Sequence, residues 1–347
     1  MEERFADGEK IKQRLNRIKT GEKVSADTPK VSVIVPAYDI APFVKEALES
    51  VFAQTYKNFE VVLVNDGSKD TNELKTALAP YFERIIYAEQ MNLGAAQARN
   101  SAICLARGEL LAFLDGDDVW LPNFLASQVN FLEKNLLEMV YCDAEIFGEP
   151  LFAGKTFMQN APSSGEVTTS SLIGGKCNVI TSGTLLRKDL LVEFNMFDTE
   201  VPRVEDFDLW FRLVKNGAKI GYQHKVLLKY RVRSGSLSGS NMQRAERSIA
   251  AYETIQRKYE LTDLEEKILE ERKQTAAAEL HLETGKFHLT QENFAEAKIH
   301  FTEANKFYRK LRLSVVTWLV RFSPGLILLL FKKLRPLEFF FILGGKS

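Results

Sequence analysis

The chain has 347 residues, of which 45% are hydrophobic and 27% charged; this composition is typical of a globular protein, and the length allows more than one domain. Its 46 basic and 46 acidic residues cancel, and a formal net charge of zero argues against a dedicated nucleic-acid-binding protein. The three cysteines, Cys104, Cys142 and Cys177, form no Cys-x-x-Cys pair, which argues against a disulfide framework or a zinc site and fits a reducing, cytoplasmic compartment.

The predicted elements begin with residues 1–29, which we expect to form a charged amphipathic helix and a linker that ends at Pro29. This stretch lacks the apolar core of a signal peptide, so we expect no export. From residue 30 onward, short apolar runs alternate with helical patterns. Strands are expected at 31–35, 59–64, 85–87, 110–114 and 139–141, with helices at 41–53, 70–82, 94–107 and 121–134. This alternation is typical of an α/β fold, a mostly parallel sheet with helices on both faces.

The next stretch, 148–175, is rich in Gly, Ser and Thr and predicts an irregular connection. Regular structure resumes at 179–186, followed by a helix over 205–215 and extended chain over 220–232. A run of Ser and Gly follows at 234–240, so we expect the first domain to span residues 30–240.

Residues 241–311 are predicted to be helical. The spacing of a tetratricopeptide-like helical hairpin is matched by Gly285, Phe294, Ala297, Phe301 and Ala304. Arg309 stands where such a repeat usually has proline, and a generic helical hairpin explains the pattern equally well. A single unit cannot bury its apolar face alone, so we expect it to pack on neighbouring helices or on the first domain.

Residues 312–347 form a basic and apolar tail; from 305 to 337 there are eight basic residues and no acidic one. Pro324-Gly325 interrupt the apolar run 313–331, which disfavours a transmembrane helix because such a helix needs about 20 apolar residues. Basic residues beside Trp318 instead favour interfacial helices on an anionic membrane surface. We therefore expect peripheral attachment to the inner face of the cell membrane, with a protein-docking face as the alternative.

The most informative motif is 110–118, a buried-strand pattern that ends in Asp115, Asp117 and Asp118. Like charges packed at a strand end need a compensating cation, and hard oxygen ligands suit Mg²⁺ or Mn²⁺. A solvated acidic loop is the alternative for an isolated pair. Four further motifs surround it: 31–38 with Pro36, Ala37 and Tyr38; 61–68 with Asp66; 92–100 with Asn92 and Arg99; and 204–213 with Glu205 and Asp206.

Together, in this order, the five motifs resemble the family 2 glycosyltransferases of the GT-A fold over about residues 30–240. The resemblance implies transfer of a sugar, with inversion, from a nucleotide-diphosphate donor, with UDP as the family default and with Mg²⁺ or Mn²⁺ as cofactor. It implies donor contacts by Pro36, Ala37, Tyr38, Asp66, Asn92, Arg99, Asp115 and Arg233, a metal held by Asp117 and Asp115, and Asp206 as catalytic base.

Two residues depart from the family pattern: Asp39 stands where Asn is common, and Arg233 stands where His often follows a Tyr-Arg pair. Arg233 could replace part of the metal's neutralisation of charge on the diphosphate. The basic tail makes a glycan or lipid-linked acceptor the expectation, in cell-envelope or extracellular polysaccharide synthesis. The sequence shows no set of spanning helices, so we expect a non-processive enzyme.

Three alternatives are weaker. A nucleotidyltransferase of related fold would carry a Gly-rich basic loop after the first strand, where this chain has Pro36-Ala37-Tyr38. A glycoside hydrolase would leave Asp66 without a role. A degenerate transferase kept as a membrane-bound scaffold is disfavoured because the carboxylates of all the motifs are present.

Overall fold

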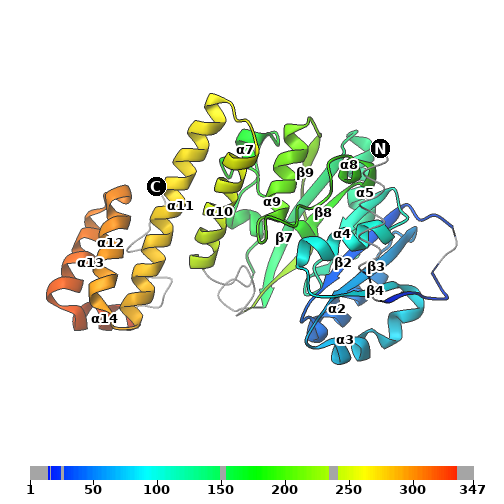
Figure 1. Ribbon diagram of the computed structural model, residues 1–347, viewed down its shortest axis with the longest axis horizontal. Coiled ribbons are helices and arrows are strands. Elements are labelled where there is room, and N and C mark those ends of the chain that lie inside the picture. The colour runs from blue at the N-terminus through cyan, green and yellow to red at the C-terminus, as the bar shows by residue number, and fades with distance from the viewer. Residues whose placement is uncertain (1–14, 16, 25–26, 149–153, 234–240, 334–347) are drawn as a thin grey trace. The chain divides into compact units, whose positions relative to one another are not determined.

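The computed structural model describes residues 15, 17–24, 27–148, 154–233 and 241–333. The chain divides into two compact units, residues 1–234 and 235–347, and each is considered by itself. Predictions for 1–14, 149–153, 234–240 and 334–347 lie outside the described residues. Figure 1 labels the elements of both units.

The described part of the first unit is built on a nine-stranded sheet with the order β1-β4-β3-β2-β5-β8-β7-β9-β6. Its strands are β1 (Arg17–Thr20), β2 (Val31–Ala37), β3 (Phe59–Asp66), β4 (Ile86–Gln90), β5 (Leu110–Phe113), β6 (Val119–Trp120), β7 (Met139–Gly148), β8 (Thr184–Arg187) and β9 (Ile220–Val232). The predicted parallel pairing holds along β4-β3-β2-β5 and between β7 and β9. The remaining neighbours are antiparallel, so the sheet as a whole is mixed.

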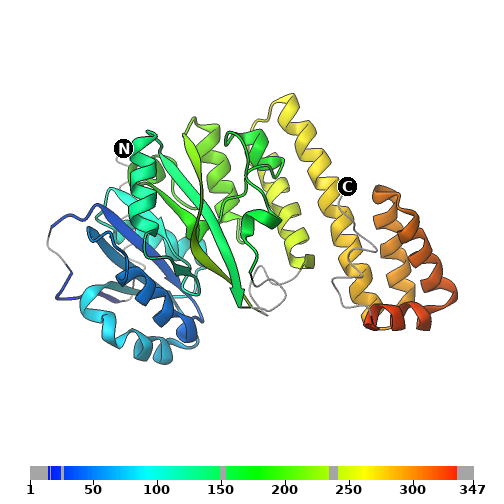
Figure 2. The same ribbon diagram turned by 180° about the vertical axis from the view of Figure 1, so that it is seen from behind.

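Helices and short turns connect these strands. They are α2 (Ala41–Phe52), α3 (Thr71–Leu78), η1 (Ala79–Arg84), α4 (Ala95–Leu105), α5 (Phe124–Lys134), α6 (Phe157–Asn160), α7 (Thr169–Ile173), η2 (Thr181–Gly183), α8 (Lys188–Glu193) and α9 (Glu205–Lys215). Figures 1 and 2, which view the molecule from opposite sides, show helices on both faces of the sheet.

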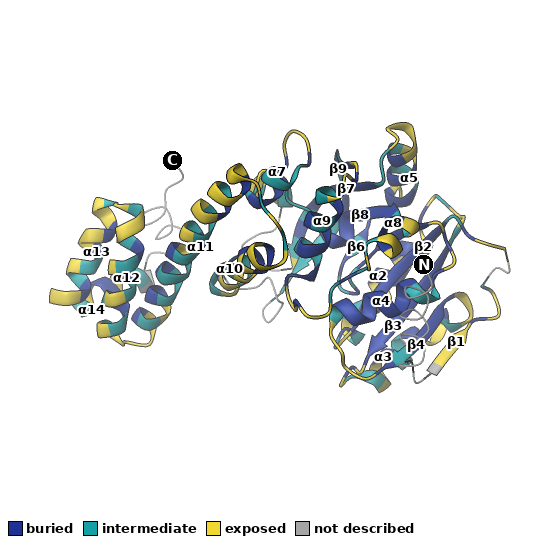
Figure 3. Cartoon of the chain, turned by 45° about the horizontal axis from the view of Figure 1, so that its top comes forward, coloured by how far each residue is buried: buried dark blue, intermediate teal, exposed yellow. Residues whose placement is uncertain are grey.

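The central strands are apolar at nearly every position because both of their faces are covered. Val33 and Val35 of β2 pack into one core with residues of α2, α3 and α5. Ile34, between them, packs into the opposite core with residues of α4, α8 and α9. Successive side chains of a strand point to opposite faces, so a strand covered on both sides has to be apolar throughout. Figure 3 shows these strands as buried.

The helix expected within residues 1–29 is wrong where the structure describes that stretch. Arg17–Thr20 is instead strand β1, antiparallel to β4. The pairing continues beyond the strand, where Gly21 N–H donates to Ile85 O at 3.0 Å. Without β1, the edge of β4 would present unpaired N–H and C=O groups. Residues 17–20 form a strand because they pair with β4, and their local sequence pattern does not indicate this pairing.

The described part of the second unit consists of α10 (Asn241–Lys258), α11 (Asp263–Thr290), α12 (Phe294–Tyr308), α13 (Leu311–Phe322) and α14 (Pro324–Lys333), each packed on the next. The predicted hairpin is the pair α11 and α12. Ala297, Phe301 and Ala304 are fully buried in it. A Cβ atom at Gly285 would lie 2.8 Å from the Phe301 ring, so glycine there permits the close approach of the two helices.

The apolar stretch predicted at 313–331 is divided, as expected, at Pro324. Helix α13 ends at Phe322 and α14 begins at Pro324, whose missing N–H is tolerated at the first position of a helix. Among the helices that the structure describes, none is both long enough and apolar enough to cross a membrane.

Candidate active site

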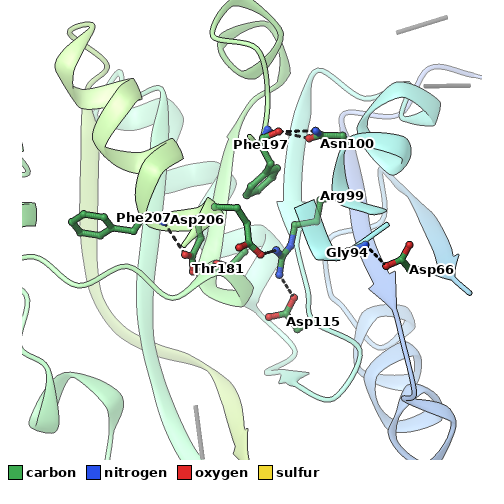
Figure 4. Close-up of polar contacts among 10 residues, drawn as sticks. Asp66, Gly94, Arg99, Asn100, Asp115, Thr181, Phe197, Asp206 and Phe207 are labelled. Carbon is green, nitrogen blue, oxygen red and sulfur yellow. Dashed lines mark hydrogen bonds and ion pairs between the residues drawn. The ribbon is translucent and has the colours of Figure 1, made fainter. Parts of the chain in front are cut away.

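The predicted site residues follow strands that end at one edge of the sheet. Asp66 is the last residue of β3, Asp115 comes two residues after β5, and Tyr38 comes directly after β2. These three strands are parallel neighbours, so their carboxyl ends lie together. Asp206 comes from a distant part of the chain, in the first turn of α9. Figure 4 shows Asp66, Asp115 and Asp206 in one view.

Asp66 is buried and holds the start of α4. Its Oδ1 accepts hydrogen bonds from Gln90 Nε2 at 2.7 Å and from Leu93 N–H at 2.9 Å. Its Oδ2 accepts one from Gly94 N–H at 2.8 Å. Burial raises the pKa of Asp66, and these three hydrogen bonds only partly oppose that effect. A carboxylate has about four acceptor positions, so one remains for a further donor.

Arg99 joins the two sides of the site. Its Nη2 donates to Asp115 Oδ1 at 2.8 Å, and its Nη1 donates to Glu205 Oε1 at 3.2 Å. Arg99 is only 7% exposed and Glu205 only 8%, so little water screens this bridge. Burial by itself would lower the pKa of Arg99, but the two carboxylates outweigh burial and raise it. The bridge links the turn after β5 to Glu205, the first residue of α9. Figure 4 shows its contact between Arg99 and Asp115.

A second contact joins α4 to the loop between α8 and α9. Asn100 Nδ2 donates to Phe197 O at 2.7 Å, and Phe197 N–H donates back to Asn100 Oδ1 at 3.0 Å (Figure 4). The Phe197 ring also lies 5.4 Å from the Arg99 guanidinium. These contacts fix the backbone from which Arg99 projects.

The turn η2 contacts the backbone of Asp115 and the carboxylate of Asp206. Ser182 Oγ accepts a hydrogen bond from Asp115 N–H at 3.1 Å, and Thr181 Oγ1 donates to Asp206 Oδ2 at 3.3 Å. The other oxygen of Asp206 accepts from Phe207 N–H at 2.8 Å. Sequence reasoning missed this turn, because residues 179–186 were expected only to resume regular structure. Thr181 and Ser182 come directly before β8, which starts beside the carboxyl end of β5, where ligands bind in such sheets. This position of two hydroxyl side chains is the signal that could have identified the turn.

Asp117 and Asp118 lie against the end of β9. Arg233 Nε donates to Asp117 Oδ2 at 3.1 Å, and Arg231 N–H donates to Asp118 Oδ1 at 2.8 Å. Burial raises the pKa of Asp117, the charge of Asp115 adds to this, and Arg233 opposes it. The pKa of Asp118 is raised further, first by burial and then by Asp117 and Asp115. Arg231, which the sequence reasoning did not single out, also donates from Nε to Asp117 O at 2.7 Å.

Gly116 gives this acidic turn its shape. A Cβ atom at Gly116 would lie 2.0 Å from Ile40 Cδ1, so any other residue there would force the Ile40 side chain to move. Ile40 is itself buried at the start of α2. The turn between Asp115 and Asp117 therefore packs directly on the loop that follows β2.

The loops after β2 and β3 are tied together by Asp39. This residue has a φ of 50°, in the left-handed region that Asn and Asp adopt more readily than most residues. Its Oδ1 accepts from Lys69 N–H at 2.8 Å, and its N–H donates to Ser68 Oγ at 3.2 Å. Aspartate can adopt this left-handed conformation, as can the Asn that is common at this position in the resembled family. Of the other expected donor contacts, Ala37 is buried and Pro36 half-buried, whereas Tyr38 and Asn92 are exposed.

The acidic turn can be tested as a metal site by its ligand chemistry. Within the described ranges, no three His, Cys, Asp or Glu side chains are grouped so that they could hold a metal ion. Mg²⁺, however, is usually held by one or two carboxylates together with substrate phosphates. Asp117 and Asp115 supply two carboxylates. Burial raises the pKa of Asp117, and repulsion from Asp115 adds to this in spite of Arg233. The residues fit a metal that is held jointly with a diphosphate.

Comparisons with known proteins identify relatives of this chain. A family model described as Glycosyl transferase family 2 matches residues 32–193. The chain is 33% identical over 222 residues to an uncharacterized glycosyltransferase of Rickettsia prowazekii (strain Madrid E), covering 63% of this chain and 69% of that protein. It is 29% identical over 221 residues to the UDP-Glc:alpha-D-GlcNAc-diphosphoundecaprenol beta-1,3-glucosyltransferase WfgD of Escherichia coli, covering 62% of this chain and 83% of WfgD.

A solved structure shares the fold. The mannosyltransferase PcManGT from Pyrobaculum calidifontis, in complex with GDP-Man and Mn²⁺, superposes with a TM-score of 0.59 at 20% identity, covering 97% of this chain and 90% of that one. At this identity the likeness concerns the architecture alone. It confirms the predicted GT-A type of sheet.

Proposed function

The chain belongs to the family 2 glycosyltransferases, and on this premise we propose that it moves a sugar from a UDP-sugar to a lipid-linked or other glycan acceptor, with inversion and one residue at a time. The observation that carries this proposal is the buried Asp115–Arg99–Glu205 bridge. It couples the acidic turn, on the donor side, to the helix that carries Asp206, on the acceptor side. A reaction between two substrates needs both halves held in one geometry.

Asp206 is the proposed catalytic base. Each of its oxygens accepts one hydrogen bond, from Thr181 and from Phe207 N–H, so each retains an acceptor position for a hydroxyl. An acceptor hydroxyl bound within about 3 Å would pass its proton to this carboxylate as it attacks the anomeric carbon. The attack displaces the nucleoside diphosphate from the opposite face of the sugar, and the configuration therefore inverts.

The leaving diphosphate gains negative charge, which has to be neutralised on the donor side. When bound by Asp117 and Asp115, Mg²⁺ or Mn²⁺ would supply that positive charge. Arg233, whose Nε lies 3.1 Å from Asp117 Oδ2, is a second source of positive charge in this chain. Pro36, Ala37, Tyr38, Asp66 and Asn92 complete the proposed nucleotide pocket.

The acceptor class rests on a relative. The name of WfgD includes a diphosphoundecaprenol-linked sugar as its acceptor, and WfgD is 29% identical to this chain. We extend to this chain a lipid-linked acceptor of cell-envelope or extracellular polysaccharide synthesis. Such an acceptor lies at a membrane, and residues 312–347, basic and apolar, are the proposed attachment to its inner face. The transferase domain proper would span residues 30–240.

Equilibrium binding of UDP tests the donor half of this proposal. We expect UDP to bind at micromolar to millimolar concentration, and more tightly with Mn²⁺ than with EDTA. The variant Asp206→Asn should bind UDP like the wild type, because Asp206 acts on the acceptor. Failure of UDP and of other nucleoside diphosphates to bind, with or without Mn²⁺, would contradict the proposal.

A further inference from the structure

One face of α13 is apolar and exposed, although the helix is already packed on its other side. The packed side chains are Leu313, Val316 and Val320, which belong to the core of the second unit. The exposed ones recur every three or four residues and are Leu311, Val315, Trp318 and Phe322, with exposed fractions from 49% to 81%. A helix that is apolar on both sides needs cover on both, so this stripe is a surface for a partner.

Beside the stripe, α12 and α13 enclose an open groove of about 430 Å³. Its lining residues are Lys298, Thr302, Asn305, Lys306, Ser314, Thr317, Trp318, Arg321 and Phe322. Three of these are cations and none is acidic. Glu303, which is not a lining residue, pairs with Lys306 at 2.7 Å and offsets part of that charge. The groove therefore attracts an anion.

The aromatic rings form one rim of the groove. The Trp318 and Phe322 ring centroids lie 5.2 Å apart, and the Arg321 guanidinium lies 4.9 Å from the Phe322 centroid. Trp and Phe beside Lys and Arg is the combination that helices use at a membrane surface, where the rings enter the headgroup layer and the cations meet phosphates. A soluble anion would leave these rings exposed.

We propose that this groove binds the phosphate headgroup of an anionic phospholipid, while the stripe of α13 enters the interfacial layer of the bilayer. This inference deepens the proposed membrane attachment and rests on it. It assigns the contact to Lys298, Lys306 and Arg321 on two packed helices. A second copy of the chain is a poor occupant, because a two-fold interface centred on this groove would bring the cations of both copies together.

Trp318 itself reports the proposed contact. The chain has three tryptophans, and Trp120 and Trp210 are buried in the first unit at 2% exposure each. Quenching of emission by brominated lipids should therefore come from Trp318. We expect quenching of the full-length protein by vesicles that contain phosphatidylglycerol, and none by vesicles of phosphatidylcholine alone. Equal quenching by both kinds would overturn the headgroup assignment, and quenching by neither would overturn the contact.

Charge removal then locates the site. The triple variant Lys298→Gln, Lys306→Gln, Arg321→Gln should partition into phosphatidylglycerol vesicles roughly 100-fold more weakly, because each basic residue at an anionic surface changes the partition about fivefold. The matched control removes the same charge from exposed positions of α10 and α11, by Arg257→Gln, Lys258→Gln and Lys267→Gln. If both triple variants lose the same amount of vesicle partitioning, the effect comes from net charge, and the groove is not the binding site.

Two further arms separate the sources of failure. Millimolar glycerol phosphate should not displace the wild-type protein from vesicles; displacement would assign the groove to a soluble phosphate instead of a lipid. UDP binding should be the same in the wild type and in both triple variants. A wild type that binds UDP but no vesicle overturns the attachment and leaves the transferase assignment intact, whereas a loss of UDP binding in the groove variant alone would show that this surface serves the donor site.

Discussion

Replacing Arg99 by methionine should destabilise the first unit by about 3–5 kcal/mol, the usual cost of removing one partner from a buried ion pair. Arg99 donates to Asp115 at 2.8 Å and to Glu205 at 3.2 Å, and its removal leaves both carboxylates without that cation. Glu205 should be affected most, because burial already raises its pKa and the charge of Arg99 is the largest influence that opposes this. Methionine keeps an unbranched apolar stem, so the loss reports mainly the missing charge.

The assay is urea unfolding followed by tryptophan fluorescence in a Trp318→Phe background. Only Trp120 and Trp210 then remain, and both belong to the first unit, so the second unit does not contribute to the signal. Trp210 lies on α9 itself, in the helix that begins at Glu205. The free energy of unfolding is obtained by linear extrapolation for each variant.

A second substitution separates the charge from the packing. Glu205→Gln in the Arg99→Met background removes the stranded carboxylate, and we expect it to restore part of the stability, with a coupling energy of about 0.5–3 kcal/mol. The matched control is Lys23→Met, which removes an exposed partner from Glu83 and should leave the unfolding midpoint unchanged. The reasoning is refuted if Arg99→Met behaves like Lys23→Met, or if the two site substitutions are simply additive.

Three further outcomes are expected. Burial raises the pKa of Asp118 in the folded protein above its ordinary value of 3.8. The wild type should therefore lose stability as the pH rises from that ordinary value to the raised one, and Asp118→Asn should become more stable relative to the wild type over the same range. A difference between the two proteins that does not change with pH in urea unfolding would contradict this. Gly116→Ala should cost about 1–3 kcal/mol by urea unfolding, and Ile40→Val, which removes the clashing Cδ1, should restore most of it. Asp117→Asn should abolish the Mn²⁺-dependent part of UDP binding in calorimetry while metal-free binding persists.

Much of the first unit could be predicted because its strands are short apolar runs bounded by turns. The strand at Ile220–Val232 and the helix at Glu205–Lys215 have the expected bounds. Strand β1 could not be predicted, because Arg17–Thr20 is charged and becomes a strand only through pairing with β4. Hydrophobic periodicity indicates which side of a single segment is buried. It cannot indicate an edge strand that forms only by pairing with a strand about seventy residues away.

The site divides in the same way. The acidic turn after β5 is visible in the sequence, because carboxylates crowded directly after an apolar strand repel one another and need a compensating cation. The contact between Arg99 and Glu205 is not visible, since the two residues are 106 positions apart and meet only when α4 and α9 pack on the same face of the sheet. The hydroxyls of Thr181 and Ser182 were missed for a related reason: Ser and Thr are common in turns whether or not they touch a site.

Acceptor-dependent release of UDP tests the central claim most directly. The wild-type protein is incubated with a panel of UDP-sugars, Mn²⁺ and a lipid diphosphate-linked sugar, and released UDP is measured with and without the acceptor. We predict release that depends on the acceptor, that falls at least about 100-fold in Asp206→Asn, and that leaves UDP binding to this variant unchanged. Release that is unaffected by Asp206→Asn, or UDP binding without any acceptor-dependent release across the panel, would contradict the account.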